Sequence, residues 1–194
     1  MNLIDHFIKI CRPTPHSVLF FYNLLDLMLT LYLKMAIRFP AEFLTDHFVN
    51  KVMRFALFAV TSCSDIECQL AGLKFISVVI SGEFTKSFEL LNIISENQAN
   101  DLLENLPKLV HFSNGQEINK EVLNLEDETN INTLACSIRL ITSRCLCNLI
   151  KLLPEQFINR HRDVNILPLL DQLVDDSNRY VRIEAVQARN LWLT

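Results

Sequence analysis

The stretch DQLVDDSNRYVRIEAVQARNLW, residues 171–192, decides the fold. Its triplet Asp175-Asp176-Ser177 offers oxygens that cap the free amides at a helix start, and its charges suit the positive end of the helix dipole. The apolar positions that follow recur every three or four residues, as on one face of a helix: Val181, Ala185, Ala188 and Trp192. We therefore expect a helix here whose alanines let a neighbouring helix approach closely.

The composition of the whole chain agrees with a helical fold. Its 194 residues are 50% hydrophobic and include only three glycines, where average usage would give about 14. This scarcity excludes the glycine-rich phosphate loops and the nucleophile elbow, which need clustered glycines. It also argues against an all-β protein, whose tight turns consume glycine. The chain is long enough for one sizeable core.

An internal repeat appears when three expected helix starts are superposed. Cys68, Ile138 and Val181 then share one position. The next position holds Gln69, Arg139 and Arg182. The 43 residues from Ile138 to Val181 fall within the ~40–47 residues of HEAT and armadillo repeats. We therefore predict an all-α, HEAT/armadillo-type solenoid of stacked helical hairpins, which has a concave side suited to binding partners.

The prolines and the charge divide the chain. Pro154 ends the expected helix 133–153, Pro168 lies near the start of the expected helix 166–174, and Pro107 interrupts 97–112, since proline breaks helix interiors. The net charge of −4 belongs to the polar stretch 113–130, because the rest carries 17 basic and 17 acidic residues. We expect helical repeats over 1–112, an acidic loop or linker over 113–130 and the last repeats over 131–194. No basic surface indicates direct binding to nucleic acid.

The sequence offers no constellation for catalysis or for a cofactor. The five histidines lie in separate segments, so no nucleophile–base pair can be nominated, and we expect no enzyme. The six cysteines include no CxxC motif. Cys145 and Cys147 point to nearly opposite sides of a helix and chelate poorly. We expect reduced thiols packed in the core; metal binding through the cysteines is the alternative.

The most apolar segment runs from Leu19 to Ile37. Its length of 19 residues is that of a membrane span. However, Asn23, Asp26 and Lys34 lie inside it, and charges in a bilayer are costly. A helix buried in a packed array is the simpler interpretation, and we expect no membrane partner.

Basic residues form a stripe on the last expected helix. Arg179, Arg182 and Arg189 are spaced by three and seven residues. Two interpretations are open. The stripe is a solvated face whose arginines pair with acidic residues of a neighbouring repeat, or it contacts a partner. Exposed charge is common, which favours the first.

At these residues the sequence resembles the C-terminal end of the MMS-nineteen family, the large HEAT-repeat adapters of the cytosolic iron–sulfur assembly (CIA) targeting complex. The shared pattern is a double Asp, a basic residue and then Val-Arg-x-Glu-Ala-Val-x-Ala-Arg-x-x-Trp. It is met by Asp175, Asp176, Arg179, Val181, Arg182, Glu184, Ala185, Val186, Ala188, Arg189 and Trp192. The segment 148–154 is similar to the family's penultimate repeat. The likeness covers the last third of the chain; residues 1–112 agree only in helical character.

The resemblance implies a non-catalytic adapter of the cytoplasm and nucleus that holds no cofactor. Its protein partners would be the cluster-transfer subunit and the β-propeller subunit of the CIA targeting complex, together with iron–sulfur client proteins such as DNA repair and replication enzymes. The candidate partner-binding residues are Arg179, Arg182, Glu184, Arg189 and Trp192. The alternative is another HEAT-repeat scaffold, for example an importin-β-like transport receptor.

Overall fold

The computed structural model describes residues 46–62, 66–81, 96–113 and 125–194, together with positions 27, 30, 31 and 34. Within these ranges every regular element is a helix, which confirms the all-helical prediction. The elements are α4 (Asp46–Ser62), α5 (Ile66–Ile80), α7 (Glu96–Ser113), α8 (Leu125–Leu152), α9 (Glu155–His161), the π-helix η2 (Arg162–Ile166), α10 (Leu167–Leu173) and α11 (Arg179–Leu193).

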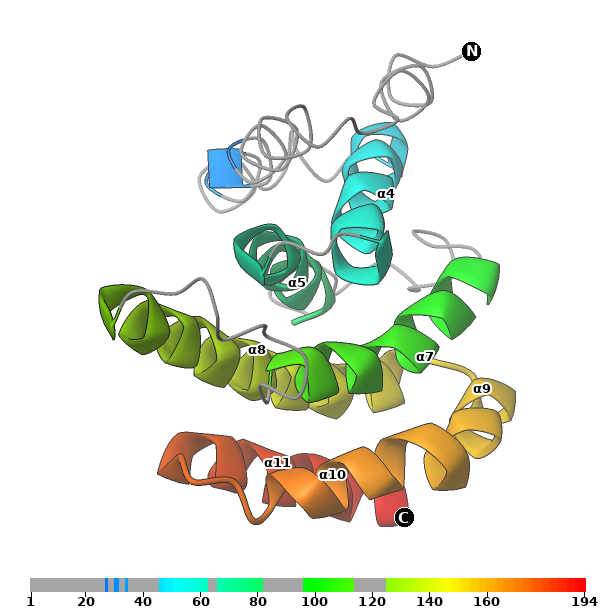
Figure 1. Ribbon diagram of the computed structural model, residues 1–194. Helices are drawn as coiled ribbons and strands as arrows, with labels where there is room; N and C mark the ends of the chain where they lie inside the picture. The colour runs from blue at the N-terminus through cyan, green and yellow to red at the C-terminus, as the bar shows by residue number, and fades with distance from the viewer. Residues whose placement is uncertain are drawn as a thin grey trace.

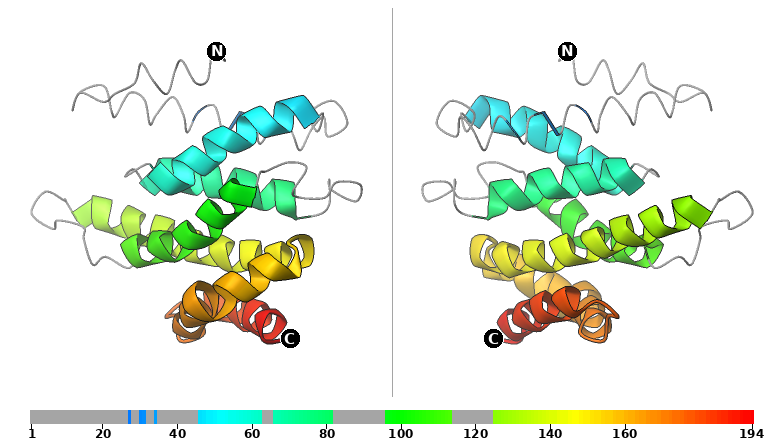
Figure 2. Two further views of the ribbon diagram at one scale, coloured as in Figure 1. Left: turned by 90° about the vertical axis from the view of Figure 1, so that its right-hand side faces the viewer. Right: turned by 90° about the vertical axis from the view of Figure 1, so that its left-hand side faces the viewer.

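The helices pack as consecutive pairs. α4 packs on α5, α7 on α8, and α10 on α11. The second helices of the pairs also contact one another, so that α8 lies between α5 and α11. The first helices follow the same order, with α4 against α7 and α7 against α9 and η2. Figures 1 and 2 show the resulting layers, from α4 at one end to α10 and α11 at the other.

One hydrophobic core runs through all of these pairs. It begins at Met53 in α4 and ends at Trp192 in α11 without a break into separate clusters. The three superposed repeat positions, Cys68, Ile138 and Val181, are all fully buried. The core therefore joins the expected first part of the array, 1–112, to the expected last part, 131–194.

Helix α8 is the central element of this core. Its stretch Asn132–Leu152 is long and apolar enough, by length and composition, to cross a membrane. In the fold this stretch packs against α5, α7 and α11, and Arg139 and Arg144 on it form ion pairs with α11 and the turn before it. Contact with three helices accounts for its apolar composition.

Two boundaries differ from the prediction. Residues 125–130, expected in the acidic loop, form the first turns of α8. Acidic residues near a helix N-terminus are favourable in general, because they complement the helix dipole. Pro107 lies inside α7 rather than interrupting it. The buried Leu102, Leu103, Leu106 and Leu109 hold this helix in the core on both sides of the proline.

Other predictions fall outside the described residues. These are most of the apolar segment Leu19–Ile37, and the part 114–124 of the acidic loop. The ends marked by Pro154 and Pro168 agree with the structure, since Pro154 is the N-cap of α9 and Pro168 lies in the first turn of α10.

Gly72 sets the distance between α4 and α5. A methyl group at this position would lie 2.7 Å from the carbonyl oxygen of Ala56 and 2.8 Å from the Cβ of Ala59. Both distances are shorter than van der Waals contact, and the nearer atom belongs to the backbone of α4. The absence of a side chain at Gly72 therefore allows the two helices to touch.

We expect Gly72→Ala to destabilise the protein. Overpacking of a core costs about 1–3 kcal/mol, which exceeds the gain of up to about 1 kcal/mol in helix propensity. Urea denaturation followed by circular dichroism measures the change. A variant at least as stable as the wild type would show that α4 and α5 separate at little cost.

Candidate protein-binding site in the last helices

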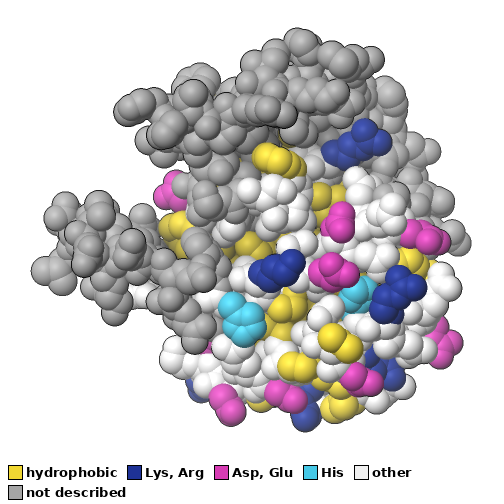
Figure 3. All heavy atoms as spheres, turned by 45° about the vertical axis from the view of Figure 1, so that its right-hand side comes forward, with side chains coloured by type: hydrophobic (Ala, Val, Ile, Leu, Met, Phe, Trp, Pro, Cys, Tyr) yellow, Lys and Arg dark blue, Asp and Glu magenta, His cyan; other side chains and the backbone are white. Residues whose placement is uncertain are grey.

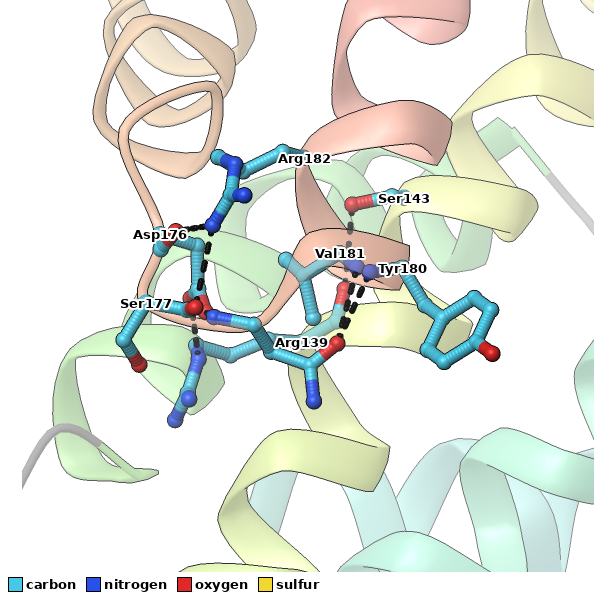
Figure 4. A network of polar contacts seen from close by, with 8 residues as sticks. Arg139, Ser143, Asp176, Ser177, Tyr180, Val181 and Arg182 are labelled. Atoms are coloured by element: carbon cyan, nitrogen blue, oxygen red, sulfur yellow. Dashed lines mark hydrogen bonds and ion pairs between the residues drawn. The ribbon is translucent and has the colours of Figure 1, made fainter.

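The turn between α10 and α11 is tied to α8 through Asp176 (Figure 4). Its Oδ2 accepts a hydrogen bond from Nε of Arg139 at 2.6 Å. Its Oδ1 accepts from the backbone N–H of Asn178 at 2.7 Å. Both side chains of the ion pair are largely buried, with exposed fractions of 12% for Arg139 and 7% for Asp176. A charge-assisted contact shielded from solvent therefore fixes the start of α11.

The residue that caps α11 is Asn178. The predicted cap, Asp175-Asp176-Ser177, ends one residue before it. Oδ1 of Asn178 accepts hydrogen bonds from the backbone N–H groups of Tyr180 at 2.8 Å and Val181 at 3.4 Å. Asp176 is engaged with Arg139 and with the N–H of Asn178, so it stabilises the turn that leads into the cap.

Arg182, Glu184 and Arg189 all have partners within the chain. Arg182 donates through Nη1 to the carbonyl oxygens of Asp176 at 2.7 Å and Ser177 at 2.9 Å. Glu184 pairs with Arg144 of α8 at 2.9 Å, and Arg189 pairs with Asp171 of α10. All three contacts are intramolecular: they join α11 to the turn before it, to α8 and to α10.

Trp192 is fully buried, so its side chain packs within the chain and does not face a partner. Its Nε1–H donates to the backbone carbonyl oxygen of Leu146 in α8 at 3.0 Å. The indole fixes the end of α11, just as Asp176 fixes its start. Arg139 of α8 contacts the start of α11, and Leu146, which lies later in α8, contacts its end. The two helices therefore run parallel.

Arg179 is the one predicted site residue that is directed outward. It is exposed, and no hydrogen bond or ion pair joins its guanidinium to the part of the chain that the structure describes. The structure therefore separates the predicted set into one exposed cation and four residues engaged in intramolecular contacts.

Sequence reasoning missed the apolar residues on the outer surface of α11. Tyr180, Ile183, Val186 and Leu193 are exposed, with exposed fractions between 44% and 69%. The signal was present, since these residues alternate with the buried face of the same helix.

The described cysteines are free thiols. Cys68 and Cys145 are fully buried, which confirms that they pack as small apolar residues. Burial raises the pKa of Cys145 to about 12, and burial, with Glu184 nearby, raises the pKa of Cys147 to about 11. Both thiols are therefore protonated near neutral pH in this structure. Among the described residues no three His, Cys, Asp or Glu side chains form a cluster that could hold a metal ion.

A second polar cluster joins α7 to the π-helix η2 at His161, which is almost fully buried. Its Nε2 lies 3.0 Å from Oδ1 of Asn100, and its Nδ1 lies 3.0 Å from Nδ2 of Asn165. An amide oxygen accepts and an amide nitrogen donates, so the ring is the neutral tautomer with its proton on Nε2. Burial lowers the pKa of His161, Glu104 opposes this shift, and Arg160 adds to it.

The lowered pKa of His161 predicts a loss of stability in mild acid. The unfolded chain takes up a proton as the pH falls through about 6.5, while the folded ring stays neutral to a lower pH. Stability is therefore complete above the unfolded pKa and decreases as the pH falls toward the folded pKa. We expect the urea midpoint to fall more between pH 7.5 and 5.5 in the wild type than in His161→Gln. Equal changes in the two proteins would contradict the assignment.

The described surface is electrostatically mixed. Figure 3 shows basic and acidic side chains interspersed with apolar ones on one face of the molecule, over α7, α9 and the helices that follow. On this face no large patch of one sign stands out among the described residues.

Comparisons with known proteins give no relative. The chain matches no protein-family model, no curated protein and no solved structure at a significant level.

Proposed function

We propose that this chain is a non-catalytic HEAT-type adapter that binds protein partners through its last helices. The observation that carries the proposal is the repeated packing of the helix pairs. The equivalent residues Cys68, Ile138 and Val181 are all buried, and α5, α8 and α11 follow one another in contact. A solenoid of stacked hairpins is built in this way, with each unit burying its apolar face only against its neighbours.

The partner class follows from the resemblance over residues 170–192. That segment is similar to the C-terminal end of the MMS-nineteen adapters, so the proposed partners are the cluster-transfer subunit and the β-propeller subunit of the CIA targeting complex. Iron–sulfur client enzymes of DNA repair and replication would then bind the assembled complex. Such work belongs to the cytoplasm and nucleus and needs no cofactor, nucleic acid or membrane contact by this chain.

The intramolecular contacts of α11 support this function indirectly. Arg139, Asp176 and Trp192 hold both ends of α11 on α8, which leaves a rigid outer surface. A preorganised surface loses little entropy on binding. The exposed Arg179 lies on that surface, near the start of the helix.

A binding assay with purified CIA targeting subunits tests the proposal. The full chain should retain both subunits, and Arg179→Glu should weaken the complex without changing the melting temperature, because no hydrogen bond or ion pair joins the Arg179 guanidinium to the described residues. The matched control is Arg54→Glu, a charge reversal at an exposed position of α4, which should leave binding unchanged.

Two results would contradict the proposed function. The first is failure of the folded wild-type chain to retain either subunit. The second is binding to the small nuclear-transport GTPase without the CIA subunits, which would identify an importin-β-like receptor.

A further inference from the structure

The outer face of α11 corresponds to the face that the next helix covers on α5 and on α8. In the repeat register four outward positions recur on each second helix of a pair. They are Leu70, Leu73, Ser77 and Ile80 in α5; Leu140, Ser143, Cys147 and Ile150 in α8; and Ile183, Val186, Asn190 and Leu193 in α11.

On α5 and α8 these positions are covered. Helix α5 packs against α8, and Sγ of Cys147 in α8 lies 3.9 Å from the carbonyl oxygen of Glu184 in α11. All eight side chains are buried or partly buried. The outward face of each of these helices is therefore an interface with the helix that follows.

On α11 the same positions are exposed. The exposed fractions are 44% for Ile183, 45% for Val186 and 51% for Leu193. Figure 2 shows α11 at the end of the layers, with no described helix beyond it. Three apolar side chains therefore form an uncovered stripe along the helix.

Charge indicates what would cover this stripe. Across the interface between α8 and α11, the arginine Arg139 of the earlier helix binds the carboxylate Asp176 in the turn before the later one. In the repeat register Arg182 is the counterpart of Arg139, yet its guanidinium donates to the carbonyl oxygens of Asp176 and Ser177 and forms no ion pair with a carboxylate that the structure describes. Arg179 beside it is exposed. The face thus combines an apolar stripe with unmatched positive charge at its N-terminal end.

We propose that this outer face of α11 docks an amphipathic helix of a protein partner, and that an acidic turn precedes that helix. The partner helix lies parallel to α11, as α11 lies on α8. Its apolar residues cover Ile183, Val186 and Leu193, and its acidic turn reaches Arg182 and Arg179. The inference rests on the proposed adapter function only for the source of the helix.

A peptide with the sequence of residues 170–193 is a suitable probe, because it holds an acidic turn followed by the helix that covers the same positions of α8. Fluorescence anisotropy with the full chain should show saturable binding. The double variant Ile183→Glu/Val186→Glu should weaken binding about tenfold or more, because a buried apolar stripe would become charged. Peptide carrying Asn in place of Asp175 and Asp176 should bind about threefold more weakly.

The control is Val164→Glu, which places one glutamate at an exposed apolar position of η2. It should leave peptide binding unchanged, and circular dichroism should show that all variants keep their helix content. Failure of the wild type to bind the peptide, or equal weakening by Val164→Glu, would overturn the docking face. A dimer of the wild-type chain that Ile183→Glu/Val186→Glu abolishes would identify a second copy, not a partner, as the occupant.

The assay with the CIA targeting subunits separates this inference from the proposed function. A complex that forms with the wild type and is weakened by Ile183→Glu/Val186→Glu supports both. A complex that the double variant retains at full strength overturns the docking face and leaves the adapter function standing. If the wild type forms no complex, the adapter function fails, and the peptide alone decides the docking face.

Discussion

Trp192→Ala should destabilise the protein by about 3–5 kcal/mol, because it removes a fully buried indole from the core and leaves a cavity. The hydrogen bond from Nε1 to the carbonyl oxygen of Leu146 is lost as well, at a cost of about 1 kcal/mol. Since a domain is stable by about 5–15 kcal/mol, this single change removes a large part of the total. The urea midpoint should fall by about 2 M for a slope near 2 kcal/mol per M.

The adjacent residue provides the control. Leu193 is half exposed, and Leu193→Ala should cost less than about 1 kcal/mol. Trp192→Phe keeps an aromatic ring but lacks the donor, so its stability should lie between that of the wild type and that of Trp192→Ala. Similar midpoints for Trp192→Ala and Leu193→Ala would show that the end of α11 does not contribute to the cooperative core.

Arg139→Ala should destabilise the protein by about 3–5 kcal/mol, because it leaves the largely buried carboxylate of Asp176 without its counter-charge. The start of α11 should loosen with it, since Asp176 also accepts the N–H of Asn178. Urea denaturation gives the free energy, and hydrogen exchange of the first turn of α11 gives the local effect.

A second substitution distinguishes a lost ion pair from a lost side chain. Adding Asp176→Asn to Arg139→Ala removes the unpaired charge and keeps an oxygen for the Asn178 amide, so the double variant should be more stable than Arg139→Ala alone. Arg189→Ala breaks a pair that is far more exposed, at 39% and 57%, and should cost no more than about 1 kcal/mol. A double variant no more stable than the single one would show that packing of the arginine stem matters most.

Periodicity was sufficient to predict the helices and much of the core. The series ending at Trp192 was predicted on one face of a helix, and all four of its members are buried. The repeat register placed Cys68, Ile138 and Val181 at equivalent positions, and all three are buried, but the repeat itself stays a prediction. Spacing along a helix depends on local geometry alone, which explains why it can be read without tertiary contacts.

Contacts between segments that are distant in the sequence could not be predicted from helical periodicity. The sequence predicted the cap of α11 at Asp175-Asp176-Ser177. Asp176 instead binds Arg139, and this contact depends on how α8 and α11 pack. The acidic composition of residues 125–130 also predicted a loop there, but these residues begin α8. The candidate site differs most from its prediction. Four of its five residues turned out to have intramolecular contacts, and the exposed apolar stripe was visible only once the covered faces of α5 and α8 were known.

The central place of α8 has a consequence for how the molecule opens. This helix shares buried side chains with the pair before it and with the helix after it, so its own amides are released only when both neighbours detach. Opening can begin at α11 and move inward one pair at a time, while α8 stays closed until late. We therefore expect amide exchange to be slower in α8 than in α11, and a helix bound on the proposed docking face should slow exchange first in α11.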